Sequence, residues 1–189
     1  MAREAVRAIV LCEDRDHGSF LHQLLKQRGV DPIRIFVAPH GAGSAEQWVR
    51  ERLEAEVVAF RARANHQANL VLFVMSDGDN EGVQGRKATL DGRLVSAGHA
   101  ARGANERIVY LVSTWSIETW LFWLCNPGLT ASGITEGAAY KDDATYKARV
   151  REGSISVKEA VAHWLPARAT ESAAVPSLAD ARVEWDRVP

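Results

Sequence analysis

The feature that most constrains the fold is an alternation, through the first part of the chain, between short apolar runs and amphipathic segments. The apolar runs are VRAIVLC (6–12), IRIFVA (33–38), NLVLFVM (69–75) and RIVYLV (107–112). Each is nearly all apolar, as is typical of a strand covered on both faces of a parallel sheet. The alternation predicts the order β-α-β-α-β-α-β, an α/β fold in which a parallel sheet of about four strands is flanked by helices.

The segments between these strands have the apolar spacing of helices that pack one face against a sheet. The apolar face of the first helix is formed by Phe20, Leu21, Leu24 and Leu25, and that of the second by Val49, Leu53, Val57 and Phe60. Ser44 and Gln47 form a capping box at the start of the second helix, after the HGAG loop. A weaker pattern over residues 83–97 predicts a third helix with Leu90 and Leu94 in the core.

The chain after the fourth strand is predicted to be helical with a long loop. The segment TWSIETWLFWLC reads as a helix that ends at the following NPG, and further helices begin near Ser156 and at Pro176. Residues 129–154, rich in Gly, Thr and charge, are expected to be a loop with short helices. We therefore expect an α/β catalytic domain over 1–128 and a helical extension over 129–189 that packs on the same core.

Composition narrows the class of protein. Hydrophobic residues make up 47% and charged residues 25%, as in ordinary globular proteins. No apolar run approaches the roughly 20 residues that cross a bilayer, and acidic residues follow the first apolar run too soon for a signal peptide. We expect a cytoplasmic protein without a membrane partner. The net charge of −1 excludes a polycation that grips nucleic acid by bulk electrostatics, so such contacts must be local or bridged by metal.

Acidic residues follow two of the predicted strands. Glu13 comes after the first strand, and Asp77 and Asp79 come after the third. Ligands of open parallel sheets collect beyond the carboxyl ends of the strands, so these carboxylates converge if the two strands are neighbours. Carboxylates gathered in one pocket repel one another, and a divalent cation such as Mg²⁺, with Mn²⁺ as a substitute, relieves that repulsion.

Two further interpretations concern the SDGDNEG segment. Gly78 is expected to let the backbone turn so that both aspartates reach the same side. The simpler alternative is that the segment is only a polar surface turn, because Asp, Gly and Asn are common turn formers.

The pieces CEDRDHGSFLHQLL, PHGAGS, MSDGDNEG and STWSIETWL together resemble the Toprim domain of topoisomerases, primases and OLD-family nucleases. The similarity extends over roughly residues 5–125, the span of an α/β unit. It is nearest to the stand-alone Toprim proteins and OLD-type nucleases of prokaryotic defence loci. The resemblance implies a Toprim-like, Rossmann-like fold and a Mg²⁺-dependent nuclease acting on DNA or RNA in anti-phage defence.

The resemblance also implies roles for single residues. Glu13 would be the general acid/base or first metal ligand, and Asp77 and Asp79 would be catalytic Mg²⁺ ligands. Ser76 would be a minor ligand, and Glu118 an outer ligand of a second metal.

Two positions depart from the family pattern or leave it open. Asp14 stands where the family usually has Gly, and the second acidic position of the first motif falls on Asp16 or His17, which we take as auxiliary residues.

Other residues near the predicted edge have weaker signals. Gly41 and Gly43 precede a helix N-terminus, where backbone N–H groups bind phosphate, although a plain turn explains them equally well. Arg86, Lys87 and Arg93 could line a phosphate path, and a solvated helix face is the interpretation that we favour. For Trp115, Trp120 and Trp123 we favour core or interface packing over stacking on bases. Cys12 and Cys125 lie in apolar runs and read as buried, unreactive thiols.

The first hypothesis is thus a metal-dependent nuclease with nucleic acid as its partner. By analogy with OLD-type proteins, a separately encoded ATPase is a candidate partner, and a homodimer is expected only from general frequency. A receiver-like phosphoacceptor domain is the second hypothesis, but it needs a Lys after the last strand, where Ser113 to Trp115 stand. A catalytically degenerate Toprim binding module is the third, supported by Asp14.

Overall fold

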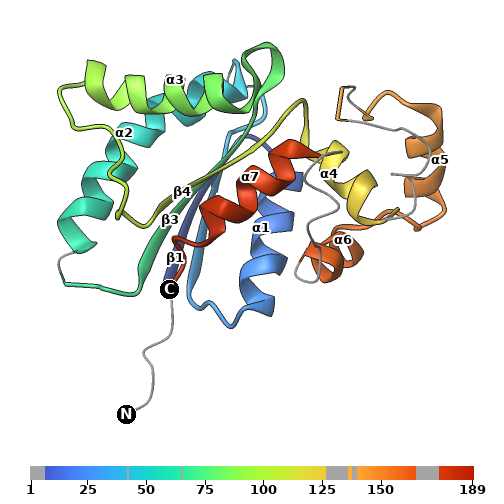
Figure 1. Cartoon of the computed structure of the whole chain (residues 1–189), viewed down its shortest axis with the longest axis horizontal. Helices are drawn as coiled ribbons and strands as arrows, with labels where there is room; N and C mark the ends of the chain where they lie inside the picture. Colours follow the sequence, from blue (N-terminus) through green and yellow to red (C-terminus); the bar gives the residue numbers. More distant parts are fainter. Residues whose placement is uncertain (1–6, 42, 65, 127–135, 138–139, 165–174) are drawn as a thin grey trace.

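A computed structural model describes residues 7–41, 43–64, 66–126, 136–137, 140–164 and 175–189. Its centre is an all-parallel sheet of four strands in the order β2-β1-β3-β4 (Figure 1). The strands are β1 (Arg7–Cys12), β2 (Ile33–Val37), β3 (Leu70–Asp77) and β4 (Ile108–Ser113). The predicted α/β class with a parallel, helix-flanked sheet is confirmed, and each predicted strand is found within two residues of its expected ends.

Helices cover both faces of the sheet (Figure 1). On one face lie α2 (Ala45–Ala64) and α3 (Gly82–Ser96), which follows the short 3₁₀ turn η1 (Asp79–Glu81). On the other face lie α1 (Arg15–Gln27), α4 (Ile117–Leu124), α6 (Val157–Trp164) and α7 (Pro176–Trp185), while α5 (Ala144–Arg151) lies farther out. Strand residues alternate between the two faces: Val10 and Phe73 pack toward α1, and Leu11 and Leu72 toward α2, so the buried parts of β1 and β3 are apolar on both faces.

The register brings two strand ends with polar side chains together. β1 lies between β2 and β3, with Cys12 opposite Val37 on one side and opposite Met75 on the other. Asp77, the last residue of β3, lies opposite Ser113, the last residue of β4. The first and third strands are therefore neighbours, which the predicted convergence of their carboxylates required.

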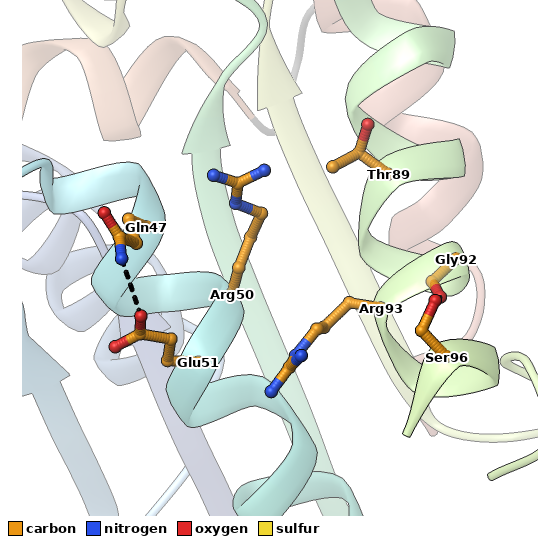
Figure 2. Close-up of a pocket in the computed structure, with 7 residues that line it drawn as sticks. All are labelled: Gln47, Arg50, Glu51, Thr89, Gly92, Arg93 and Ser96. Atoms are coloured by element: carbon orange, nitrogen blue, oxygen red, sulfur yellow. Dashed lines mark hydrogen bonds between the residues drawn. The ribbon is translucent and has the colours of Figure 1, made fainter. Parts of the chain in front are cut away.

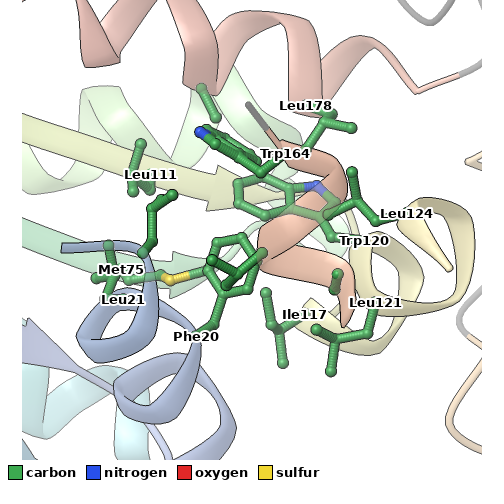
Figure 3. Close-up of a cluster of buried hydrophobic side chains, with 14 of the residues drawn as sticks. Phe20, Leu21, Met75, Leu111, Ile117, Trp120, Leu121, Leu124, Trp164 and Leu178 are labelled. Atoms are coloured by element: carbon green, nitrogen blue, oxygen red, sulfur yellow. The ribbon is translucent and has the colours of Figure 1, made fainter. Parts of the chain in front are cut away.

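The core under α1 is rich in aromatic rings (Figure 3). Trp120 is fully buried, and its ring lies 6.1 Å from that of Phe20 and 5.7 Å from that of Trp164. Its indole N–H donates a 2.7 Å hydrogen bond to the hydroxyl of Ser177, so its one polar atom is satisfied inside the core. The prediction that the tryptophans of this helix pack in the core is confirmed for Trp120 and Trp123.

Buried ion pairs and hydrogen bonds of Glu184 hold helix α7 against the edge strand β4. The carboxylate of Glu184 accepts a 3.0 Å hydrogen bond from Lys87 of α3 and is paired with Arg102. It also accepts a 3.3 Å hydrogen bond from the backbone N–H of Tyr110 in β4. Because α6 and α7 bury Trp164 and Trp185 in the same cluster as α1, the C-terminal helices share one core with the sheet. The predicted boundary at 128/129 and the predicted stop at Pro127 lie outside the described residues.

Several smaller expectations are also resolved. Ser44 caps α2 by accepting a 3.4 Å hydrogen bond from the backbone of Gln47, but the Gln47 side chain bonds to Glu51 instead, so the capping box is only half formed. Cys12 and Cys125 are buried free thiols, as expected. Within the described ranges, no helix combines the length and apolarity needed to span a membrane.

Candidate functional site

The carboxylate of Glu13 lies directly after β1 and is held by the neighbouring strand. The hydroxyl of Ser76, near the end of β3, donates a 2.5 Å hydrogen bond to Glu13 Oε1. Burial raises the pKa of Glu13 from 4.5 to about 7, against the opposing effects of the Ser76 hydrogen bond and the nearby His17. At neutral pH this group is therefore present in both its acid and its base form.

His17 is fully buried between two carboxylates. Its Nδ1 lies 3.1 Å from Asp14 Oδ1, and its Nε2 lies 3.1 Å from Asp77 Oδ1. Burial alone would lower the pKa of His17, but its hydrogen bonds with Asp14 and Asp77, together with their charges, outweigh burial and raise the pKa to about 10. The imidazole is thus a cation that bridges the end of β3 and the start of α1.

Asp14 does not open the loop in the way a glycine would. Its side chain accepts a 2.8 Å hydrogen bond from the backbone N–H of His17, which makes it the N-cap of α1. Burial would raise the pKa of Asp14, yet hydrogen bonding with His17 and the charge of that residue lower it. Asp14 therefore has a structural role, which is to start α1 and to hold His17.

Asp77 is held by contacts from three elements. Its Oδ1 accepts a 2.6 Å hydrogen bond from Ser113 of β4 as well as facing His17, and its backbone carbonyl accepts a 2.8 Å hydrogen bond from Arg86 of α3. The next residue, Gly78, donates a 2.7 Å hydrogen bond to the carbonyl of Ser113. These contacts fix the position of the carboxylate before any ligand binds.

Asp79 points away from that cluster. Its side chain is 53% exposed and its Oδ2 lies 3.8 Å from Nη2 of Arg86, a guanidinium that is also paired with Glu46. The expected reason for Gly78 is wrong, because Gly78 has φ −79° and the left-handed residue is Asp79 with φ 45°. Gly78 is required for space instead: a Cβ there would lie 2.9 Å from the carbonyl oxygens of Ser113 and Thr114.

The remaining predicted residues lie around this centre. Asp16 is exposed in the first turn of α1, and Glu118 is half-buried in the first turn of α4. Burial, followed by the charges of Glu118 and Asp16, raises the pKa of Tyr146 to about 12, which places both carboxylates near α5. Gly41 and Gly43 are exposed with φ of 83° and 85°, and no described atom lies within 4 Å of where their Cβ would be.

One group of described residues has the spacing of metal ligands. Atoms of Asp14, His17 and Asp77 lie within 4.8 Å of one another, but protonated His17 has no lone pair for a metal, so in that state only the two aspartates can be ligands. Both described hydrogen bonds to the Asp77 carboxylate reach Oδ1, and the one to Glu13 reaches Oε1, so the second oxygen of each is left for another partner. Glu13 is not part of the group with ligand spacing, and carboxylate oxygens such as those of Asp14 and Asp77 are ligands that hard divalent cations prefer.

Sequence reasoning missed three residues of this site. Asp14 and Ser113 were not assigned to it, and Arg86 was wrongly assigned to a solvated face although it is only 2% exposed; the same assignment is wrong for Lys87, which is 8% exposed and bonded to Glu184. The Asp-x-x-His spacing of Asp14 and His17, typical of an N-cap, was a usable signal. Ser113 has no comparable signal, because only the register of β3 and β4 brings it to Asp77.

Comparisons of the chain with models of protein families, with curated proteins and with solved structures found no match.

Proposed function

We propose that this chain is a metal-dependent nuclease of the Toprim type, which hydrolyses a phosphodiester of DNA or RNA with Mg²⁺ or Mn²⁺. The observation that carries the proposal is the pair formed by Glu13 and Asp77 at the ends of neighbouring parallel strands. Each keeps one carboxylate oxygen bonded to a serine hydroxyl and leaves the other free within the described structure. Preformed, oriented carboxylates of this kind are what a catalytic cation requires of its protein.

Each residue of the site then has a defined task. Asp77, with Asp14 beside it, would hold the cation, which when bound withdraws charge from the scissile phosphate. With a pKa near 7, Glu13 takes a proton from the attacking water at its free Oε2 and can return it to the leaving oxygen. His17 and Ser113 fix Asp77 through Oδ1, while Arg86 fixes the backbone of the same residue.

The test is cleavage of plasmid DNA, single-stranded DNA and structured RNA by the purified chain with Mg²⁺ or Mn²⁺. Glu13→Gln and Asp77→Asn keep the shape of each side chain and remove its charge. Each should lower the rate by roughly a hundredfold or more, the usual contribution of a general acid/base or metal ligand. Glu152→Gln, an exposed change at the end of α5, is the matched control and should cut like the original chain.

Cutting that persists in Asp77→Asn would contradict the proposal, because it would show that the activity belongs elsewhere. If the chain cuts no substrate with either metal, a nuclease that is active alone is ruled out. A separately encoded ATPase, the partner that the resemblance implies, is then the component to add.

A catalytically inactive Toprim-like binding module is the alternative that one observation favours. The cationic His17 already compensates Asp14 and Asp77, so the cluster does not need a metal to neutralise it. Calorimetric titration with Mn²⁺ separates the two functions: the nuclease binds the ion and loses that binding in Asp77→Asn, whereas the binding module takes up no ion at this cluster.

A further inference from the structure

A hollow lies at the end of the sheet opposite the carboxylate site, where the strands begin. It has a volume of about 220 Å³ and is lined by the starts of β1, β2 and β3 and by the end of α2. The lining residues are Arg7, Ala8, Ile9, Pro32, Arg34, Arg63, Gln67 and Leu70. Five steps of about 3.3 Å along β1 separate this edge from Cys12, so the hollow lies ~17 Å from the carboxylate site.

Three arginines from different elements line this hollow. Arg34 lies opposite Ile9 in the register of β1 and β2, and Ile9 packs on the α2 face of the sheet. Arg7 precedes Ile9 by two positions, so it projects to the same face. Arg63 reaches the hollow from the last turn of α2. The guanidinium of Arg34 lies over the ring of Phe36, 4.5 Å from its centroid and two positions farther along β2, so it would turn toward the strand start to bind a ligand beside Arg7.

The charge of this hollow is unbalanced. Its lining includes three arginines and no carboxylate, and all three side chains are exposed. Over the part of the chain that the structure describes, Arg7, Arg34 and Arg63 form no ion pair. Other arginines do: Arg61 bonds to Glu106, and Arg102 is paired with Glu184.

The groove between α2 and α3 provides the contrast (Figure 2). It is larger, about 420 Å³, and is lined by Arg50 and Arg93. Arg50 lies 3.3 Å from a carboxylate oxygen of Glu46, and Arg93 lies 3.1 Å from one of Glu54, so each cation there is already compensated. Two arginine-lined hollows thus differ in whether their charge is neutralised within the chain.

We propose that the hollow at the strand starts is a phosphate-binding site, in which Arg7, Arg34 and Arg63 hold the phosphate group of a ligand and the amide of Gln67 donates a further hydrogen bond. Guanidinium groups match phosphate oxygens with paired N–H donors, and three of them together repel one another unless an anion lies between them. The volume is below the roughly 300–1,000 Å³ of sites that enclose a whole small molecule, so the hollow fits a phosphate group rather than an entire cofactor.

This site does not depend on the proposed nuclease activity. It is too far from Glu13 and Asp77 to contact a phosphodiester that reacts there. The phosphate can come from a free ligand or from the backbone of a nucleic-acid strand, and the chemistry of recognition is the same.

Binding to the full chain in EDTA, which removes divalent metal, tests the site with two probes. Pyrophosphate is titrated by calorimetry, and a fluorescent single-stranded oligonucleotide by anisotropy. The triple variant Arg7→Gln/Arg34→Gln/Arg63→Gln should weaken binding by about a hundredfold or more, since each charged hydrogen bond contributes about a tenfold change in affinity and the variant removes three. The triple variant Arg7→Lys/Arg34→Lys/Arg63→Lys keeps the charge but loses the paired N–H donors. Its affinity should therefore lie between that of the original chain and that of the Gln variant.

The control is Arg50→Gln/Arg93→Gln/Arg151→Gln, which removes the same net charge from other surfaces and should change affinity less than about twofold. Loss of pyrophosphate binding in the first triple variant alone supports a site for a free phosphorylated ligand. Loss of oligonucleotide binding alone supports a contact with a nucleic-acid strand. The proposal is overturned if neither probe binds, or if both triple variants weaken binding equally. Circular dichroism checks that each variant is folded.

Discussion

Ser113 and Asp77 end neighbouring strands directly opposite each other, and the Ser113 hydroxyl donates a 2.6 Å hydrogen bond to Asp77 Oδ1. The carboxylate that we propose as a metal ligand is therefore oriented from the sheet itself. Since hydrogen bonds of this type fix which oxygen a carboxylate presents, the affinity for metal should depend on a residue that never touches the ion.

The first prediction follows from that bond. Ser113→Ala should weaken Mn²⁺ binding by about tenfold, the lower end of the range for residues that orient metal ligands. Ser116→Ala is the matched control, because its hydroxyl is buried a few residues away without a hydrogen-bond partner among the described residues. Calorimetric titration with Mn²⁺ measures both. Equal affinity in Ser113→Ala and the original chain would contradict a role for Ser113 in orienting Asp77.

The second prediction concerns the buried cation. His17→Asn removes the charge between Asp14 and Asp77, and breaking a buried ion pair by removing one partner costs about 3 kcal/mol or more. The free energy of unfolding, measured by urea denaturation in EDTA, should fall by that order. His22→Asn, an exposed change on the same helix, should leave it within about 0.5 kcal/mol. A neutral effect of His17→Asn would mean that the carboxylates do not need this cation.

The third prediction uses the pH dependence of stability. The pKa of Glu13 rises from 4.5 in the ordinary case to about 7 in the folded chain, so the folded state holds this proton more tightly than the unfolded state does. The stabilising contribution of the Glu13 carboxyl to the free energy of unfolding is therefore fully present below pH 4.5 and is lost as the pH rises toward 7.

Glu13→Gln does not titrate. The free energy of unfolding of the variant minus that of the original chain should thus increase between pH 4.5 and 7 and stay constant above. Denaturation curves in EDTA across this range measure the difference, and Glu152→Gln should give a flat line. A flat line for Glu13→Gln as well would show that the Glu13 carboxyl keeps its ordinary pKa.

The fourth prediction compares two glycines. A Cβ on Gly78 would lie 2.9 Å from three backbone atoms, which cannot yield as a side chain can. Gly78→Ala should cost about 1–3 kcal/mol and push the end of β3 away from β4. Gly92→Ala lies within α3 with no described atom near its Cβ and should stabilise the chain by about 0.5–1 kcal/mol. Thermal denaturation of both variants distinguishes these opposite signs; stabilisation by Gly78→Ala would refute the close approach.

The fifth prediction tests how α7 is attached. Glu184→Gln leaves Lys87 paired with Asp180 but removes the buried carboxylate beside Arg102, and it should cost about 3 kcal/mol. Asp186→Asn, an exposed neighbour, should change stability by less than about 0.5 kcal/mol. Urea denaturation followed by tryptophan fluorescence measures both, because α7 carries Trp185. A small effect of Glu184→Gln would show that apolar packing alone holds the helix.

The sheet could be predicted because its strands are buried on both faces, and a run such as NLVLFVM has few other uses. Part of the site could be predicted for the same reason. Glu13 directly follows β1 and Asp77 ends β3, and the ends of these neighbouring strands must meet.

The rest depends on contacts that are distant in sequence. Arg86 is buried because it reaches Glu46, which lies 40 positions away, and nothing near Arg86 in the sequence reveals that partner. Asp79 shares the motif of Asp77, but its left-handed backbone directs its side chain toward Arg86 rather than toward His17. The motif therefore indicated that both aspartates lie in the cluster, whereas the structure brings only Asp77 next to His17.

The sharing of one core by α1 and α7 has a consequence for synthesis on the ribosome. The last strand of the sheet ends at Ser113, but the face that packs Phe20 and Phe73 is covered by Trp164 and Trp185. A nascent chain that has released all four strands still presents this face to solvent. We therefore expect the emerging sheet to need protection from aggregation, by a chaperone or by fast elongation, until α7 has left the exit tunnel.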